Sequence, residues 1–210
     1  FRTLQYNVQY RVPGYIEWLG GEDPRIAYGQ YRQQLQLIQH YRPHGARFAL
    51  KDPTHSVFVD TILELFPKAR FVFTHRDPAT TMSSLCSLYA YTRALFSDDV
   101  APHALGPELL HSYIPASLEA ALEKVDALPS GRVAHMRHVD VRRDPIGTMA
   151  QAYRDLGMEL SEPARAAMEA MIDAEDQKAR SIHVHSPEGF GLSADEIRER
   201  LAGYCQRFDL

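Results

Sequence analysis

Residues 71–85, "FVFTHRDPATTMSSL", pass from an apolar run into a charged turn and then into a segment of small residues. The run "RFVFT" (70–74) is rich in strand-forming residues. Asp77 followed by Pro78 is typical of a helix start, because aspartate caps free N–H groups and proline needs no N–H there. We therefore predict a buried strand that ends in charged residues, followed by a helix that continues to Phe96.

The same alternation extends to both sides of this stretch. "ARFALK" (46–51) is typical of a strand, "HSVFVDTILELF" (55–66) of a helix, and "GRVAHMRHVDV" (131–141) of a third strand. The order strand, helix, strand, helix favours parallel strands with right-handed crossovers, and the nearly continuous apolar runs favour helices on both faces. The sequence therefore predicts an α/β core.

Further helices surround this core in the prediction. They are expected from Asp23-Pro24 to Pro43, over 108–127, from Asp144-Pro145 to Leu156, over 161–174 and after the capping box Ser193-x-x-Glu196, with a loop over 97–107.

Composition narrows the class of protein. The 210 residues are 45% hydrophobic with a net charge of −4, which favours one domain and argues against a nucleic-acid partner. No apolar run approaches the ~20 residues of a transmembrane helix. The two cysteines are far apart and favour reduced, packed thiols, so we expect a cytoplasmic protein. The oligomeric state is not predicted.

The predicted strands end in groups suited to an anion. In a parallel sheet, ligands bind at the carboxyl ends of the strands, where the first strand leads to Lys51 and His55 and the second to Arg76. An arginine beside a helix start is a good cradle for phosphate. His75 is expected to be structural, with its ring bonded to the backbone at the strand end.

Four hydroxyl residues follow on the helix at the spacing of one face: Thr80, Ser83, Ser84 and Ser87. They fit an anion site, but small residues also allow a helix to approach a sheet closely. Both readings remain open from the residues alone.

The stretch "ALKDPTHSVFVDTILELFPKARFVFTHRDPATTMSS" (49–84) resembles the central region of bacterial sulfotransferases that use 3′-phosphoadenosine-5′-phosphosulfate. That family has the pattern Leu-Lys-Ser-Pro-x-His, then His-Arg-Asp-Pro and a serine eight residues after the arginine. Arg76 and Ser84 keep that spacing, which implies that they grip the 3′-phosphate of the donor. The likeness continues more weakly through 153–161 and 183–193.

The resemblance implies a P-loop-like three-layer αβα fold with a central parallel sheet and additional helices. It also implies in-line sulfuryl transfer to a hydroxyl or amine acceptor, whether small molecule, lipid or glycan. His55 is the candidate general base, with a capping role as its alternative, and Lys51 the candidate contact to the sulfate or bridging oxygen, with an ion pair to Asp52 as its alternative. His183 is a candidate donor-binding residue, in a segment (181–192) expected to close over the donor or acceptor.

Two residues depart from the family pattern. Asp52 replaces the serine of Lys-Ser-Pro, and His185 stands where the family has tyrosine. The histidines at 135, 138, 183 and 185 lack the partners of a usual ligand set, and sulfuryl transfer of this type needs no metal, so none is expected.

A phosphate-binding loop of the type Gly-x-x-x-x-Gly-Lys-[Ser/Thr] does not occur in the sequence. Because the chain opens without Met, we expect residues 1–210 to form a single sulfotransferase-like domain whose N-terminal strand and phosphosulfate loop lie upstream. The alternatives are a non-catalytic nucleotide-binding domain and a P-loop nucleotide kinase-like phosphotransferase.

Overall fold

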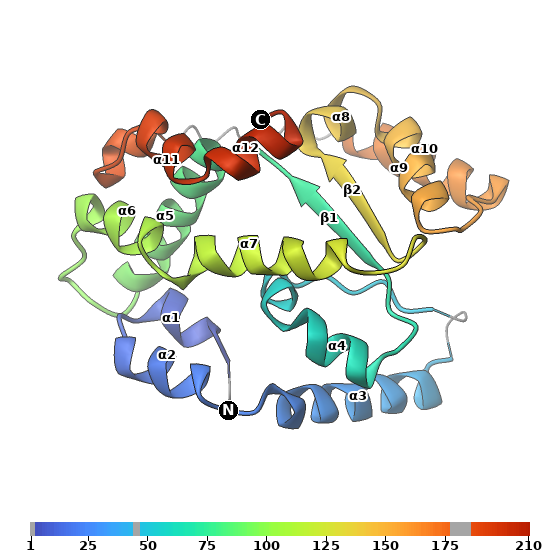
Figure 1. The fold of residues 1–210 in the computed structure, drawn as a ribbon, viewed down its shortest axis with the longest axis horizontal. Coiled ribbons are helices and arrows are strands. Elements are labelled where there is room, and N and C mark those ends of the chain that lie inside the picture. The colour runs from blue at the N-terminus through green and yellow to red at the C-terminus, as the bar shows by residue number, and fades with distance from the viewer. Residues whose placement is uncertain (1–2, 44–46, 177–185) are drawn as a thin grey trace.

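Two parallel strands lie side by side near the middle of the molecule, with helices packed around them (Figure 1). This arrangement comes from a computed structural model, which describes residues 3–43, 47–176 and 186–210. Strand β1 (Phe71–His75) pairs with β2 (Val133–Arg137), with Phe71 opposite Val133 and His75 opposite Arg137. The prediction that both segments are strands of a parallel sheet is confirmed.

Helices make up most of the remaining described chain. Their bounds are α1 Gln5–Gln9, α2 Pro13–Gly20, α3 Pro24–Tyr41, α4 Val59–Leu65, α5 Pro78–Ala94, α6 Pro102–Leu110, α7 Tyr113–Asp126, α8 His138–Arg143, α9 Pro145–Asp155, α10 Glu162–Asp176, α11 Ala194–Arg200 and α12 Ala202–Phe208, with short 3₁₀ helices η1 Pro53–Phe58 and η2 Pro187–Phe190.

The predicted helix starts are confirmed by their caps. The side chains of Asp23, Asp77 and Asp144 each accept a hydrogen bond from a backbone N–H two or three residues further on. Ser193 accepts in the same way from the N–H of Glu196. Each such cap stabilises its helix by about 1 kcal/mol, which explains why these boundaries were predictable.

The first predicted strand is wrong for the residues that can be judged. Residues 47–51 form neither a helix nor a strand, and residue 46 lies outside the described ranges. Within those ranges β1 pairs with β2 alone, so residues 47–51 have no neighbouring strand to supply hydrogen bonds. The three-layer sandwich is therefore reduced here to a mostly helical fold around two strands.

Other boundaries also differ from the prediction: the final predicted helix divides at Leu201 into α11 and α12, and three further differences have identifiable causes. The predicted loop over 97–107 contains the start of α6, whose apolar side chains Leu105 and Leu109 are buried. The predicted helix 108–127 is interrupted at Ser112, which caps the separate helix α7. The third strand ends at Arg137, and helix α8 follows at once. In each of these three cases tertiary packing or a helix cap sets the boundary, which the hydrophobic periodicity of the sequence does not define.

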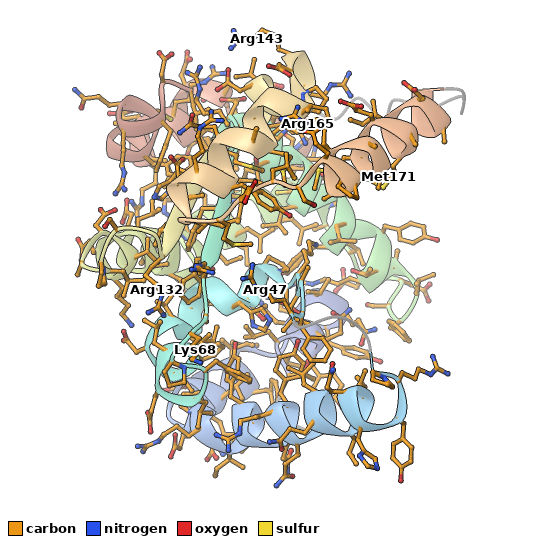
Figure 2. The ribbon with its side chains drawn as sticks, turned by 90° about the vertical axis from the view of Figure 1, so that its right-hand side faces the viewer. Arg47, Lys68, Arg132, Arg143, Arg165 and Met171 are labelled. Carbon is orange, nitrogen blue, oxygen red and sulfur yellow. The ribbon has the colours of Figure 1, made fainter. Side chains whose placement is uncertain are left out.

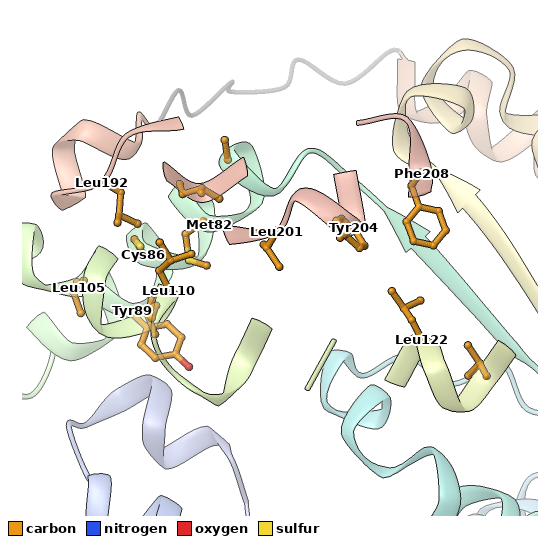
Figure 3. Packing of buried hydrophobic residues seen from close by; sticks show 14 of the residues in the cluster. Met82, Cys86, Tyr89, Leu105, Leu110, Leu122, Leu192, Leu201, Tyr204 and Phe208 are labelled. Atoms are coloured by element: carbon orange, nitrogen blue, oxygen red, sulfur yellow. The ribbon is translucent and has the colours of Figure 1, made fainter. Parts of the chain in front are cut away.

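The main core lies where α5, α6, α7, α11 and α12 meet (Figure 3). Cys86 and Leu110 are fully buried in it, and Tyr204 and Phe208 bring α12 against the end of β1. A side chain at Gly106 would lie 2.3 Å from the carbonyl oxygen of Phe190. The backbone of η2 therefore packs directly on α6.

The two ends of the strand pair are chemically distinct. In the side view of Figure 2, Lys68 and Arg132 mark the region where the strands begin, and Arg143 marks the opposite end. Arg132 is engaged there, because its guanidinium donates to the carbonyl oxygens of Ala69 and Pro67. The carboxyl ends of the strands carry the residues considered next.

Candidate active site

A cavity of about 2850 Å³ runs along β1 and opens to solvent. Its walls come from α3, residues 47–57, β1, one side of α5 from Pro78 to Thr92, and parts of α1, α4, α7 and α9. Sites for small ligands usually measure roughly 300–1,000 Å³. The cavity is therefore larger than one nucleotide-sized ligand requires.

Four of the five predicted site residues line this cavity: Lys51, His55, Arg76 and Ser84. The fifth, His183, lies outside the described residues, as does His185. Residues 186–192 of the segment expected to close over the ligands do not line the cavity and pack near α6 instead. The four residues therefore share one cavity, although they come from the region after the first predicted strand, from the end of β1 and from α5.

Arg76 is exposed at the end of β1 and forms no ion pair within the described ranges. The adjacent Asp77 does not neutralise it, because the Asp77 carboxylate accepts from the backbone N–H of Thr80 and from Arg198 at 3.1 Å. Burial raises the pKa of Asp77, but the bonds from Thr80 and Arg198 outweigh it and lower the pKa overall. The Arg76 guanidinium is thus left available to an anion.

The hydroxyl residues of α5 do not form one polar face. Ser83 is buried and donates to the carbonyl oxygen of Ala79 at 2.8 Å. The interpretation as a small residue that allows close packing therefore applies to Ser83. The Thr80 hydroxyl donates to Asp77 at 2.7 Å and serves the helix cap. Ser84 is exposed and lines the cavity together with Arg76.

His138 is a site residue that the sequence reasoning missed. It directly follows β2, and because His75 pairs with Arg137, the next residues in register are Arg76 and His138. Both line the large cavity and a second pocket of about 360 Å³. Burial lowers the pKa of His138, and the positive charges of Arg76 and Arg142 lower it further. The rule that selected Arg76, polarity at the carboxyl end of a strand, would have selected His138 too.

His55 lies in η1 with its ring turned to helix α3. Its Nδ1 is 2.8 Å from the hydroxyl oxygen of Tyr28, and the rings of Tyr28 and Tyr31 flank the imidazole. Burial, followed by the charge of Asp52, raises the pKa of Tyr28, so this phenol stays protonated. No sequence pattern marks this pair, because 27 residues separate its members.

Asp52, the replacement for the family serine, caps η1. Its carboxylate accepts from the N–H of Thr54 at 2.8 Å and from the Thr54 hydroxyl at 2.6 Å. Burial raises the pKa of Asp52, but these bonds and the nearby His55 and Lys51 lower it overall. The carboxylate is therefore ionised at the rim of the cavity.

His75 is structural, as expected, but its partners are side chains. It is 1% exposed, with Nδ1 3.2 Å from the Tyr204 hydroxyl and Nε2 2.8 Å from Nδ1 of His135. The ring of Phe208 stacks on it at 3.5 Å between centroids. Helix α12 thereby fixes the strand end that carries Arg76.

The described residues lack both a metal-binding cluster and a helix that could span a membrane. No group of three His, Cys, Asp or Glu side chains suited to a metal ion occurs among them. None of their helices is long and apolar enough to cross a membrane.

Known proteins share both this sequence pattern and this fold. An exposed, unpaired cation at the carboxyl end of a parallel strand is typical of α/β proteins that bind an anionic ligand. Residues 1–162 match the Sulfotransferase family, and the chain belongs to this family.

Two curated relatives are named omega-hydroxy-beta-dihydromenaquinone-9 sulfotransferase Stf3, from Mycobacterium bovis and Mycobacterium tuberculosis. Each is 29% identical over 154 residues, which cover 70% of this chain and 39% of the relative. The chain thus spans well under half of the length of these relatives.

Two solved structures agree in fold. The sulfotransferase STF9 from Mycobacterium avium matches with a TM-score of 0.86 at 24% identity, over 100% of this chain and 53% of that one. The sulfotransferase STF1 from Mycobacterium tuberculosis matches with a TM-score of 0.80 at 30% identity, over 96% of this chain and 52% of that one. The chain therefore shares the sulfotransferase fold, and its own described residues are mostly helical around a small parallel sheet.

Proposed function

We propose that the protein transfers a sulfuryl group from 3′-phosphoadenosine-5′-phosphosulfate to a hydroxyl or amine acceptor. One observation carries the proposal: Arg76 and Ser84, eight residues apart, line one cavity, and Arg76 has no ion-pair partner in the described part of the chain. A guanidinium and a hydroxyl arranged in this way supply the charged and neutral donors that a phosphate dianion requires. We assign them to the 3′-phosphate of the donor.

The chemistry places two demands on the remaining residues. The acceptor oxygen attacks the sulfur in line and loses its proton, a new O–S bond forms, and the bond from sulfur to the bridging phosphate oxygen breaks with its electron pair leaving on the bisphosphate. His55 is assigned as the base that takes the acceptor proton, because it lines the cavity and a neutral imidazole can accept a proton. Lys51 is assigned to the charge that grows on the leaving oxygen.

The size of the cavity supports a further part of the proposal. Val72 of β1 is 47% exposed, and Phe48 and Leu50 of the segment 47–51 are also exposed toward the cavity. Strands of parallel sheets are normally covered on both faces and paired at both edges. We propose that the full-length protein places a strand and its phosphosulfate loop here, N-terminal to residue 1, and that residues 1–210 are the rest of one domain.

A titration of the full-length protein with adenosine 3′,5′-bisphosphate, ATP and ADP tests the donor assignment. We expect binding of the bisphosphate to exceed that of ATP and ADP, and Arg76→Ala to weaken it at least about ten-fold, the usual loss for a charged hydrogen bond. Arg154→Ala is a matched control, since Arg154 is exposed and does not line the cavity. Preferred binding of ATP, unchanged by Arg76→Ala, would favour a kinase-like phosphotransferase and sink the proposal.

Turnover separates an enzyme from a binding domain. The curated relatives are named for a hydroxylated menaquinone acceptor, so the first acceptors to assay are apolar molecules with a terminal hydroxyl. Transfer of isotope-labelled sulfate from the donor to such an acceptor is the expected result. Bisphosphate binding without transfer to any hydroxyl or amine in an acceptor panel would favour a non-catalytic nucleotide-binding domain.

A further inference from the structure

The hydrogen bond between His55 and Tyr28 fixes which nitrogen of the imidazole faces the cavity. Tyr28 is 8% exposed and His55 is half-buried, and both line the cavity. Nδ1 of His55 lies 2.8 Å from the Tyr28 hydroxyl oxygen, and the ring centroids are 5.7 Å apart. Tyr31 holds the imidazole from another side, at 5.9 Å between centroids. Nδ1 is thus engaged by α3, and Nε2 is the nitrogen left for a ligand.

The direction of this hydrogen bond decides what Nε2 can do. A neutral imidazole carries one proton, on Nδ1 or on Nε2. If Nδ1–H donates to Tyr28, Nε2 keeps a lone pair and can take a proton. If the Tyr28 hydroxyl donates to Nδ1, Nε2 carries the proton and can only donate.

We propose that Tyr28 is the positioning residue of His55: its hydroxyl oxygen accepts from Nδ1–H, so that Nε2 is the basic nitrogen. This inference rests on the proposed function, because it gives the orientation that a His55 base requires. Only a hydrogen bond donated by Nδ1–H is compatible with proton uptake at Nε2. Once Nε2 has taken a proton, both ring nitrogens donate, so an Nδ1–H bond to Tyr28 stays formed and becomes charge-assisted. If Tyr28 donated the bond instead, Nε2 would already carry a proton and could not act as the base.

The burial of Tyr28 suits an acceptor that must stay neutral. Burial and the charge of Asp52 raise its pKa, so the phenol keeps its proton and does not compete for the one that His55 takes up. The arrangement parallels the general rule that a third group holds a catalytic imidazole in its working tautomer. Tyr28 acts in this proposal through its contact with the base, so its role is to position His55.

Nuclear magnetic resonance of the imidazole nitrogens tests the proton position without any turnover. We use the full-length protein with isotope-labelled histidine at about pH 8, where an ordinary imidazole is neutral. The His55 signals are those that disappear in His55→Gln. We expect a protonated Nδ1 and an unprotonated Nε2. In Tyr28→Phe, which keeps the ring and loses the hydroxyl, we expect the proton on Nε2.

Tyr31→Phe is the matched control, because it removes a hydroxyl one turn along α3 and keeps the ring beside His55. It should retain the tautomer of the unmodified protein, and the signals of the other histidines report whether each variant is folded. A proton on Nε2 in the unmodified protein, or an unchanged tautomer in Tyr28→Phe, would overturn the positioning role.

Kinetics then connect the tautomer to the reaction. Tyr28→Phe should lower kcat by about ten- to a hundred-fold, part of the usual contribution of a general base, and change bisphosphate affinity by less than about two-fold. A normal kcat for Tyr28→Phe would contradict the inference. Full turnover by His55→Gln would instead refute the base assignment of the proposed function, so the two failures are distinguishable.

Discussion

The imidazoles of His75 and His135 lie next to each other across the two strands, with Nε2 of one 2.8 Å from Nδ1 of the other. One proton serves this contact, because two protonated rings would place two donors and two positive charges face to face. Tyr204 occupies the other nitrogen of His75, and Phe208 stacks on the ring. The protonation of this histidine pair is therefore coupled to the docking of α12 on the end of β1.

We expect the protein to lose stability below pH 6.5 because of this pair. Burial, with His135 and Arg207, lowers the pKa of His75 to about 4. Loss of water and the charge of Arg207 lower the pKa of His135 as well. The unfolded chain therefore binds more protons between about pH 6.5 and pH 4, and the free energy of unfolding falls as pH falls through that window. His75 alone contributes roughly 3 kcal/mol across it.

Chemical denaturation at a series of pH values measures this loss. Replacing the exposed His111 by Gln should leave the pH profile unchanged and serves as the control. His75→Gln should be less stable at neutral pH and show a flatter profile. An equal slope in the unmodified protein and in His75→Gln would show that other groups cause the acid sensitivity.

Gly106→Ala should destabilise the protein by about 1–3 kcal/mol, the usual cost of overpacking. The added methyl would lie 2.3 Å from the Phe190 carbonyl oxygen and 2.6 Å from Leu192, so η2 would have to move away from α6. Gly29→Ala is the matched control, because Gly29 lies inside α3 with nothing within 4 Å, and alanine there should stabilise by up to about 1 kcal/mol. Thermal unfolding compares the two, and equal shifts would contradict the close packing of η2 on α6.

How far the sequence predicted this molecule depends on the range of the interactions. The starts at Asp23, Asp77 and Asp144 were predictable because a cap involves two or three neighbouring residues. Strand β1 was predictable because its apolar run is short and ends abruptly. Residues 47–51 have the same composition as a strand, yet a strand forms only where another supplies hydrogen bonds, and a local pattern does not contain that partner.

The residues of the candidate site follow the same rule: those marked by local patterns were predicted, and those that depend on tertiary contacts were missed. Arg76 and Ser84 were found because the end of β1 and an eight-residue spacing are visible along the chain, whereas Lys51 was selected from a predicted strand that does not form. Tyr28 was missed because its contact with His55 depends on how α3 docks against η1. The polar face expected on α5 was only partly right, since helical spacing places Ser83 beside Ser84 but does not tell which of the two the core buries.

Asp52→Ser should strengthen bisphosphate binding by about two- to five-fold. The carboxylate lines the same cavity as Arg76, its pKa is lowered, and it opposes an anionic ligand with the modest energy of exposed charges. Serine is also a good N-cap, so the free energy of unfolding should change by less than about 1 kcal/mol. Calorimetric titration and denaturation measure the two effects. Weaker binding in Asp52→Ser would mean that the carboxylate holds the loop in its working shape rather than repelling the donor.

His138 should make bisphosphate binding tighter as the pH falls. The pKa of His138 is lowered by burial and by Arg76 and Arg142, so at neutral pH its ring is mainly uncharged. An anion bound beside Arg76 favours the charged ring, and binding must then take up a proton. Affinity should accordingly rise from about pH 8 to about pH 6, by up to about ten-fold for a full added charge.

The variant His138→Gln isolates this contribution to binding. It keeps a hydrogen-bond donor at the end of β2 and removes the titration, so its affinity should vary less with pH than that of the unmodified protein. His103→Gln is the control, because His103 is exposed and lines neither pocket. Calorimetry in buffers of different ionisation enthalpy counts the protons taken up on binding, and an unchanged count in His138→Gln would remove His138 from the site. A reduced count would identify the end of β2 as a second cationic part of the donor pocket, beside Arg76 at the end of β1.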